Sequence, residues 1–92
     1  MKDFEKVEGK KKNKEVVLYA LSTCIWCRKT KKLLEELEVE YKYIDMDLVD
    51  DEEKYLAEIK KWNPDCSYPT MVIDNKKCIV GFQEEEIKKE FA

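Results

Sequence analysis

Two cysteines three positions apart, Cys24 and Cys27, are the residues of this chain whose type and spacing best suit covalent chemistry. They stand in the segment STCIWCR, directly after an apolar run and directly before a basic stretch that favours helix. On one helical turn, cysteines with this spacing have Cα atoms roughly 5 Å apart, within the range that a disulfide tolerates. The pair can therefore open and close without backbone movement, as thiol-disulfide exchange requires.

The two cysteines are expected to have unequal roles. Ser22 and Thr23 are good N-cap residues, so a helix should begin at or just after Cys24, where its dipole and free N–H groups favour a thiolate. Three neighbours are predicted to help lower the pKa of Cys24: Thr23, Arg28 and Lys29. Cys24 would attack a substrate disulfide, and the more shielded Cys27 would then resolve the mixed disulfide.

The residue types that the chain lacks narrow its chemistry. The 92 residues include no histidine, which excludes Ser/His/Asp and Cys/His nucleophile pairs, and two glycines cannot form a glycine-rich phosphate loop. The net charge of -3 gives no overall attraction to nucleic acid, and the run KKKNK at residues 10–14 is predicted to be a solvated turn. Without an apolar leader or a membrane-length apolar run, we expect a cytoplasmic protein with no membrane partner.

Hydrophobic periodicity predicts the element order β-α-β-α-β-β-α. Strands are expected over residues 16–21, 40–47, 70–74 and 77–80, and helices over residues 25–38, 50–62 and 83–92. The first two strands form a parallel unit, and the last two form a tight hairpin around Asn75 and Lys76. Residues 1–14 are a charged N-terminal extension before a single domain at 15–92; in it, Phe4 and Val7 favour a short added edge strand over a free tail.

The segment SYPT at residues 67–70 supports the same chemistry independently. A proline that opens a strand has no N–H to donate, and an X-Pro bond is the peptide bond that readily becomes cis. We therefore predict a cis Tyr68-Pro69 peptide that faces the corner at Cys24. The backbone of Tyr68 would then be free to pair with an extended substrate chain.

These features together resemble the glutaredoxins and the wider thioredoxin superfamily over about residues 15–91. The resemblance implies a thioredoxin-like α/β fold, with a four-stranded mixed sheet in the order 2-1-3-4 and helices on both faces. It also implies that Cys24 is the nucleophile of a dithiol-disulfide oxidoreductase, Cys27 its resolving cysteine and Pro69 its cis-proline. The substrate-binding residues expected on this basis are Trp26, Tyr68, Pro69, Gly81 and Phe82.

Departures from the common glutaredoxin pattern suggest the partners. The ending VGFQEEEI is more similar to redoxins that serve ribonucleotide reductase, so we expect protein disulfides as substrates, with that enzyme as a candidate. Leu21 stands where glutaredoxins carry a lysine that contacts glutathione. Glutathione is therefore expected to be a poor reductant and a dedicated disulfide reductase to be the electron donor. We expect a monomer that holds no metal and needs no cofactor beyond its own redox-active disulfide.

Two other classes of protein stay open. Four cysteines could hold a metal or an iron-sulfur cluster, but Cys66 and Cys78 are twelve positions apart rather than a close pair. The resemblance to the glutaredoxins, some of which hold a cluster between two chains with their nucleophilic cysteine and glutathione, makes a bridging cluster at Cys24 the stronger form of this alternative. Bound zinc or iron would favour it. An interaction domain on the same fold would need an unreactive Cys24. Cys66, three residues before the predicted cis-proline, is a weaker redox candidate than Cys24 and Cys27 but a stronger one than Cys78, which is expected to be a core residue.

Overall fold

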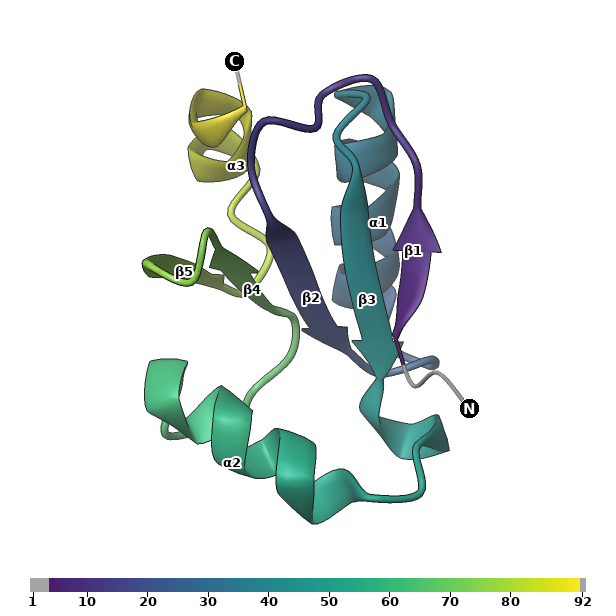
Figure 1. Ribbon diagram of the computed structural model, residues 1–92, viewed down its shortest axis with the longest axis vertical. Helices are drawn as coiled ribbons and strands as arrows, with labels where there is room; N and C mark the ends of the chain where they lie inside the picture. Colours follow the sequence, from purple (N-terminus) through teal and green to yellow (C-terminus); the bar gives the residue numbers. More distant parts are fainter. Residues whose placement is uncertain (1–3, 92) are drawn as a thin grey trace.

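The computed structural model describes residues 4–91, which form a five-stranded mixed sheet with helices on both faces (Figure 1). The strands are β1 (Glu5–Val7), β2 (Val16–Ala20), β3 (Tyr41–Asp45), β4 (Thr70–Ile73) and β5 (Lys77–Val80). The helices are α1 (Ile25–Glu36), α2 (Glu52–Trp62) and α3 (Glu84–Glu90), and a short 3-10 helix, η1 (Met46–Leu48), follows β3. No helix in this described range is long and apolar enough to cross a membrane.

The strand order is β1-β3-β2-β4-β5, which confirms the predicted order of the four main strands. β2 runs parallel to β3 and antiparallel to β4, and the N-terminal strand β1 is present as an antiparallel edge strand beside β3. Successive residues of a strand point to opposite faces, and β2 is apolar on both. Leu18 packs on the side of α1 and α3, whereas Tyr19 packs on the side of α2.

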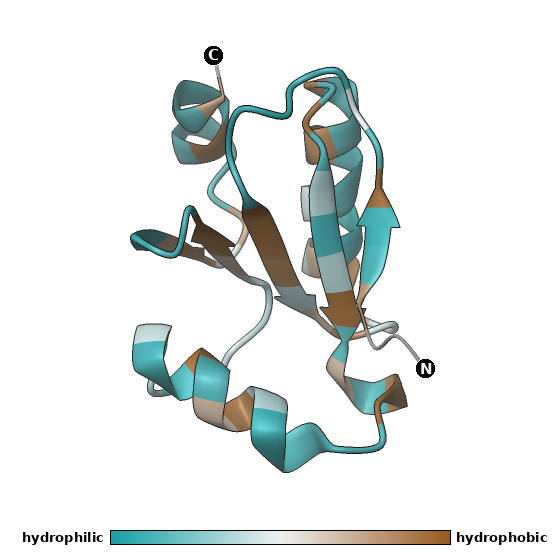
Figure 2. Cartoon of the chain, viewed as in Figure 1, coloured by the Kyte–Doolittle hydropathy of each residue, from teal (hydrophilic) through white to brown (hydrophobic). Residues whose placement is uncertain are grey.

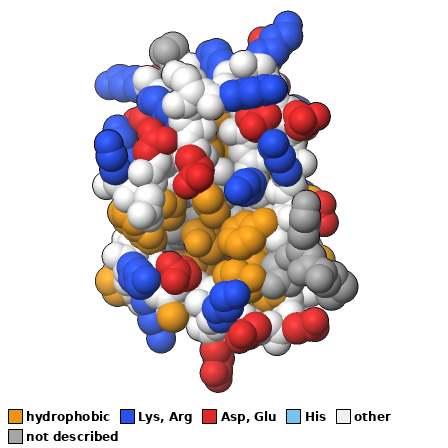
Figure 3. Space-filling view, in the orientation of Figure 1, with side chains coloured by type: hydrophobic (Ala, Val, Ile, Leu, Met, Phe, Trp, Pro, Cys, Tyr) orange, Lys and Arg blue, Asp and Glu red, His pale blue; other side chains and the backbone are white. Residues whose placement is uncertain are grey.

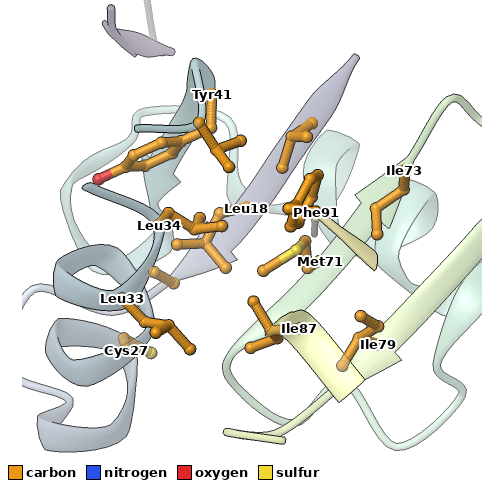
Figure 4. Packing of buried hydrophobic residues seen from close by; sticks show 13 residues of the cluster. Leu18, Cys27, Leu33, Leu34, Tyr41, Met71, Ile73, Ile79, Ile87 and Phe91 are labelled. Carbon is orange, nitrogen blue, oxygen red and sulfur yellow. The ribbon is translucent and has the colours of Figure 1, made fainter. Parts of the chain in front are cut away.

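The larger core cluster lies between the sheet and the helices α1 and α3. Figure 4 shows Leu34 of α1 beside Leu18 of β2, and Leu33 of α1 near Cys27, on the side that faces Ile87 of α3. The predicted helical spacing accounts for this packing, because buried residues of α1 recur every three or four positions. Cys27 belongs to the same cluster, so the hydrophobic core holds the redox pair's inner member in place.

The second cluster joins α2 to the opposite face of the sheet. Figure 2 shows β2 and β4 as largely hydrophobic, and in Figure 3 hydrophobic side chains gather across the middle of one face, with charged side chains around them. Phe4 meets the rings of Tyr19 and Tyr55 edge to face, with centroids 6.2 and 5.5 Å away. The N-terminal extension therefore helps to hold α2 against β2.

We expect Phe4→Ala to lower the free energy of unfolding by about 2 kcal/mol, because it removes half-buried apolar surface and two aromatic contacts. Urea denaturation followed by tyrosine and tryptophan fluorescence measures this change. Leu48→Ala is the matched control, since Leu48 is 70% exposed and its loss should change stability by less than about 0.5 kcal/mol. Equal midpoints for Phe4→Ala and the parent would show that the Phe4 side chain contributes nothing to stability.

Two predicted elements end earlier in the structure than the sequence pattern indicates. α1 ends at Glu36 rather than at residue 38, because Glu38 takes a left-handed φ of 59° and its carbonyl accepts the N–H of Lys11. A Cβ at Gly9 would stand 2.6 Å from that carbonyl oxygen, so only glycine lets the chain pass so close. The predicted strand over residues 40–47 is shorter, because η1 begins at Met46.

The hairpin turn is also shifted by one residue from the prediction. Asp74 and Asn75 are its central residues, with φ values of 53° and 52°, and Lys76 N–H donates to Ile73 at 3.0 Å. The predicted hairpin is confirmed, and Asn75 and Lys76 both lie in its turn, but the central pair is Asp74-Asn75 rather than Asn75-Lys76. The physical reason is that the tight turn needs two left-handed residues, which Asp and Asn adopt more readily than Lys.

The basic run at residues 10–14 is only in part a solvated turn. Lys11 Nζ donates to the Phe91 carbonyl, and Lys14 Nζ donates to the Glu90 carboxylate, both at 2.7 Å. Lys77 Nζ bonds the same carboxylate at 2.8 Å, and these bonds lower the pKa of Glu90. The prediction is wrong for Lys11 and Lys14, which tie the last helix to the sheet.

Candidate active site

Cys24 occupies the corner between β2 and α1, where it is the N-cap residue of the helix. Its backbone is extended, with φ -85° and ψ 117°, and its Sγ accepts the backbone N–H of Cys27 at 3.1 Å. The predicted helix start directly after Cys24 is confirmed, but the prediction that Ser22 or Thr23 caps the helix is wrong. The cysteine sulfur itself lies at the positive end of the helix dipole, as a nucleophilic cysteine requires.

Cys27 is completely buried, one turn further along α1. Figure 4 shows it at the margin of the larger core cluster, near Leu33. Burial, followed by the hydrogen bond with Cys24, raises the pKa of Cys27 to about 12. Cys27 is therefore a protonated thiol at neutral pH, and the half-exposed Cys24 is the member of the pair that a substrate can reach.

A groove of about 230 Å³ lies beside this corner, and it is lined by the five residues expected to bind substrate: Trp26, Tyr68, Pro69, Gly81 and Phe82. The Tyr68-Pro69 peptide is cis, as predicted. The Trp26 and Phe82 rings stack with centroids 6.0 Å apart, although Trp26 is 54% exposed. The fold thus brings three separate segments of the chain together as one partly aromatic surface.

The three residues predicted to tune Cys24 have different surroundings. Lys29 Nζ lies 4.6 Å from the centroid of the Trp26 ring, which places its charge over the aromatic surface. Arg28 Nη2 donates to the Ser22 carbonyl at 3.4 Å, and Thr23 is exposed. Their effect on Cys24 stays a prediction.

Sequence reasoning missed Asn63, which holds the loop that carries Pro69. Its buried side-chain amide donates to the Ser67 carbonyl, the Ser67 hydroxyl and the Thr70 hydroxyl, at 2.9 to 3.3 Å. Thr70 in turn donates to the Ser67 carbonyl at 2.7 Å. The Asn-Pro dipeptide marks a turn, but the three acceptors are visible only in the folded chain.

The remaining cysteines differ in position. Cys66 is half-buried in the second cluster with a left-handed φ of 51°. Burial raises the pKa of Tyr68, and Cys66 and Cys27 contribute smaller effects in the same direction, so Tyr68 lies within electrostatic reach of both. Cys78 Sγ contacts the Trp62 carbonyl at 3.5 Å and packs in the second cluster. Within residues 4–91, no three Cys, Asp or Glu side chains are placed to hold a metal ion.

A C-x-x-C pair at a helix N-terminus, next to a cis-proline in a sheet of this order, defines a redoxin of the thioredoxin fold. The glutaredoxin family model matches residues 16–79, and the chain belongs to the glutaredoxin family.

Individual relatives agree with this assignment. The chain is 32% identical over 74 residues to an uncharacterised glutaredoxin-like 8.6 kDa protein in the rubredoxin operon of Clostridium pasteurianum, a match that covers 80% of this chain and 93% of that protein. The glutaredoxin of Methanosarcina mazei Go1 superposes with a TM-score of 0.89 at 40% identity, over 99% of this chain and 89% of that one. Methanoredoxin of Methanosarcina acetivorans gives a TM-score of 0.83 at 42% identity, over 91% and 90% of the two chains.

Proposed function

We propose that the protein is a dithiol-disulfide oxidoreductase that reduces protein disulfides through Cys24 and Cys27. The observation that carries this proposal is the difference between the two cysteines. Cys24 is half-exposed with its sulfur at the helix N-terminus, whereas Cys27 is buried and donates its backbone N–H to that sulfur. Membership of the glutaredoxin family supports thiol chemistry but does not identify the substrate.

The reaction divides into two exchanges. The Cys24 thiolate attacks one sulfur of the substrate disulfide, the S–S bond breaks, and the other substrate sulfur leaves as a thiolate that takes up a proton. Cys27 then gives up its proton and attacks the Cys24 sulfur, which releases the second substrate sulfur and forms the Cys24–Cys27 disulfide. Two electrons pass to the substrate, and an external reductant must later return two electrons to the pair.

The groove supports an extended protein chain as the substrate. Neither backbone hydrogen-bonding group of Tyr68 has a partner within residues 4–91, so both are available to a strand of substrate. The stacked rings of Trp26 and Phe82 offer apolar surface beside it, and Ile25, next to Cys24, is 63% exposed. Such a surface suits a disulfide flanked by apolar side chains.

Trapping the mixed disulfide tests this function. We expect Cys27→Ser, incubated with insulin as the protein disulfide, to accumulate a covalent adduct through Cys24, because the resolving thiol is gone. Mass spectrometry without reductant, followed by peptide mapping, identifies the adduct and the cysteine that forms it. Turnover of insulin by Cys27→Ser at the parent's rate would exclude the two-cysteine mechanism.

Two controls accompany the trapping experiment. Cys66→Ser carries the same chemical change outside the pair, and it should release its product without an adduct. Metal analysis of the purified parent protein distinguishes the rival function. Zinc or iron near one equivalent per chain would favour a metal or iron-sulfur carrier over the oxidoreductase.

A further inference from the structure

Two hydrogen bonds join the end of β3 to the segment just before Cys24. Asp47, in η1, accepts the backbone N–H of Ser22 at Oδ1, 2.9 Å away, and the Ser22 hydroxyl at Oδ2. These bonds lower the pKa of Asp47, so its carboxylate is charged at neutral pH. Asp47 lies outside the substrate groove, and neither the sequence pattern nor the groove gives it a role.

The other hydrogen bonds of the segment over residues 21–24 are local. Cys24 N–H donates to the Leu21 carbonyl at 3.2 Å, and the exposed Arg28 makes the long contact with Ser22. The Cys24 carbonyl accepts the Arg28 backbone N–H at 3.1 Å, and its Sγ accepts the Cys27 N–H. All of these bonds lie within the unit formed by β2 and α1. In the part of the chain that the structure describes, only Asp47 of η1 makes hydrogen bonds to this segment from outside that unit.

The direction of this segment decides where the Cys24 sulfur lies. Cys24 is extended, and its Sγ reaches the Cys27 N–H because the chain enters α1 from one defined direction. If Ser22 were free, the segment would adopt other directions, and the sulfur would receive the N–H for only part of the time. A small displacement at Ser22 is therefore transmitted to the reacting atom two residues later.

We propose that Asp47 is a positioning residue for Cys24, which holds Ser22 so that the Cys24 sulfur stays within reach of the Cys27 N–H. This role serves the oxidoreductase function proposed above. It can nevertheless be tested on the reactivity of the thiol alone, so its failure and the failure of that function are separate results.

The negative charge of Asp47 and its hydrogen bonds to Ser22 have opposite expected effects on the reactivity of Cys24. A nearby carboxylate disfavours a thiolate, so if charge dominated, removing Asp47 would speed the reaction of Cys24. The charged groups around the corner are the following: Arg28, Lys29 and Lys31 of α1, and Asp45 and Asp47 at the end of β3. Positioning predicts a slower reaction after the same change, so the sign of the effect separates the two explanations.

We expect Asp47→Ala to make alkylation of Cys24 by iodoacetamide about tenfold slower at pH 7, with its pH profile displaced toward higher pH. Peptide mapping assigns the label to Cys24. Asp47→Asn loses the charge but keeps an acceptor oxygen for Ser22, so its rate should lie between those of Asp47→Ala and the parent. Asp50→Ala removes another exposed acid from the same loop and should react like the parent.

A second set of variants tests the contact with Ser22. Ser22→Ala removes only the hydroxyl bond and should slow alkylation of Cys24 less than Asp47→Ala does. The double variant Ser22→Ala/Asp47→Ala should be little slower than Asp47→Ala alone, because Asp47→Ala already breaks that bond. Thermal denaturation checks that each variant is folded at the assay temperature. Alkylation of Asp47→Ala at the parent's rate or faster, or full additivity in the double variant, would overturn the proposal.

Discussion

Replacing Cys24 by serine is expected to slow disulfide reduction by at least about a thousandfold, because a serine hydroxyl is almost never ionised near pH 7 and is a much weaker nucleophile than a thiolate. The second cysteine of the pair cannot take over. Cys27 is buried, and burial raises its pKa to about 12, so it stays protonated and inaccessible. Insulin reduction with dithiothreitol as the final reductant measures the rate.

The variants Cys66→Ser and Cys78→Ser are the matched controls for this loss. Both residues lie in the second cluster on the side of α2, outside the redox pair, so each variant should keep the parent's rate within about twofold. Limited alkylation at neutral pH adds a check that does not depend on turnover, with Cys24 expected to take the label first. Preferential labelling of Cys27 would reverse the assigned roles, and residual turnover by Cys24→Ser would place the nucleophile elsewhere.

Glutathione is expected to reduce the oxidised protein about tenfold to a hundredfold less effectively than it reduces an ordinary glutaredoxin. The family's lysine that contacts a glutathione carboxylate is replaced by Leu21, a half-buried side chain that packs against the second cluster. Loss of one charge-assisted hydrogen bond costs about 1.5 to 3 kcal/mol, which corresponds to this range of affinity.

The other end of the groove is also unfavourable for an anionic tripeptide. α3 begins with Glu84, Glu85 and Glu86, whose charges oppose the attraction of a helix N-terminus for a carboxylate. Gln83 cannot easily help, because its Nε2 donates to the Val80 carbonyl at 3.3 Å. We therefore propose that a dedicated disulfide reductase, of the thioredoxin-reductase or ferredoxin-linked type, returns electrons to the pair.

A comparison of electron donors tests this proposal. Insulin reduction should be slow with glutathione and glutathione reductase, and fast with NADPH and a thioredoxin reductase or with a ferredoxin-linked reductase. Leu21→Lys introduces the lysine that glutaredoxins use to contact a glutathione carboxylate. This variant should reduce insulin several-fold faster with glutathione, while its rate with dithiothreitol stays unchanged. Efficient insulin reduction by the parent with glutathione and glutathione reductase would contradict this proposal and show that glutathione serves as the electron donor, as in an ordinary glutaredoxin.

The order of the elements and the place of the redox pair were accessible from the sequence, because both depend on local patterns. The apolar run of β2 and the helical spacing of α1 each reflect a face buried in the core. The two cysteines at the helix start and the proline that opens β4 are near-neighbour signals of the same kind. From these the element order and the cis peptide could be predicted, whereas the sheet order and the lining of the groove were expected from the resemblance to the glutaredoxins.

Only the tertiary structure shows the contacts between distant segments. In these contacts, polar side chains that a local pattern assigns to a helix cap or to solvent bind a residue far away in the sequence instead. Ser22 is a good N-cap by residue type, yet its hydroxyl donates to Asp47, twenty-five positions further on. The Cys24 sulfur caps the helix instead. Likewise, Lys11 looks solvated in a basic run but donates to the carbonyl of Phe91, eighty positions away. A side chain's polar group bonds whichever partner the fold brings closest, and no local pattern specifies that partner.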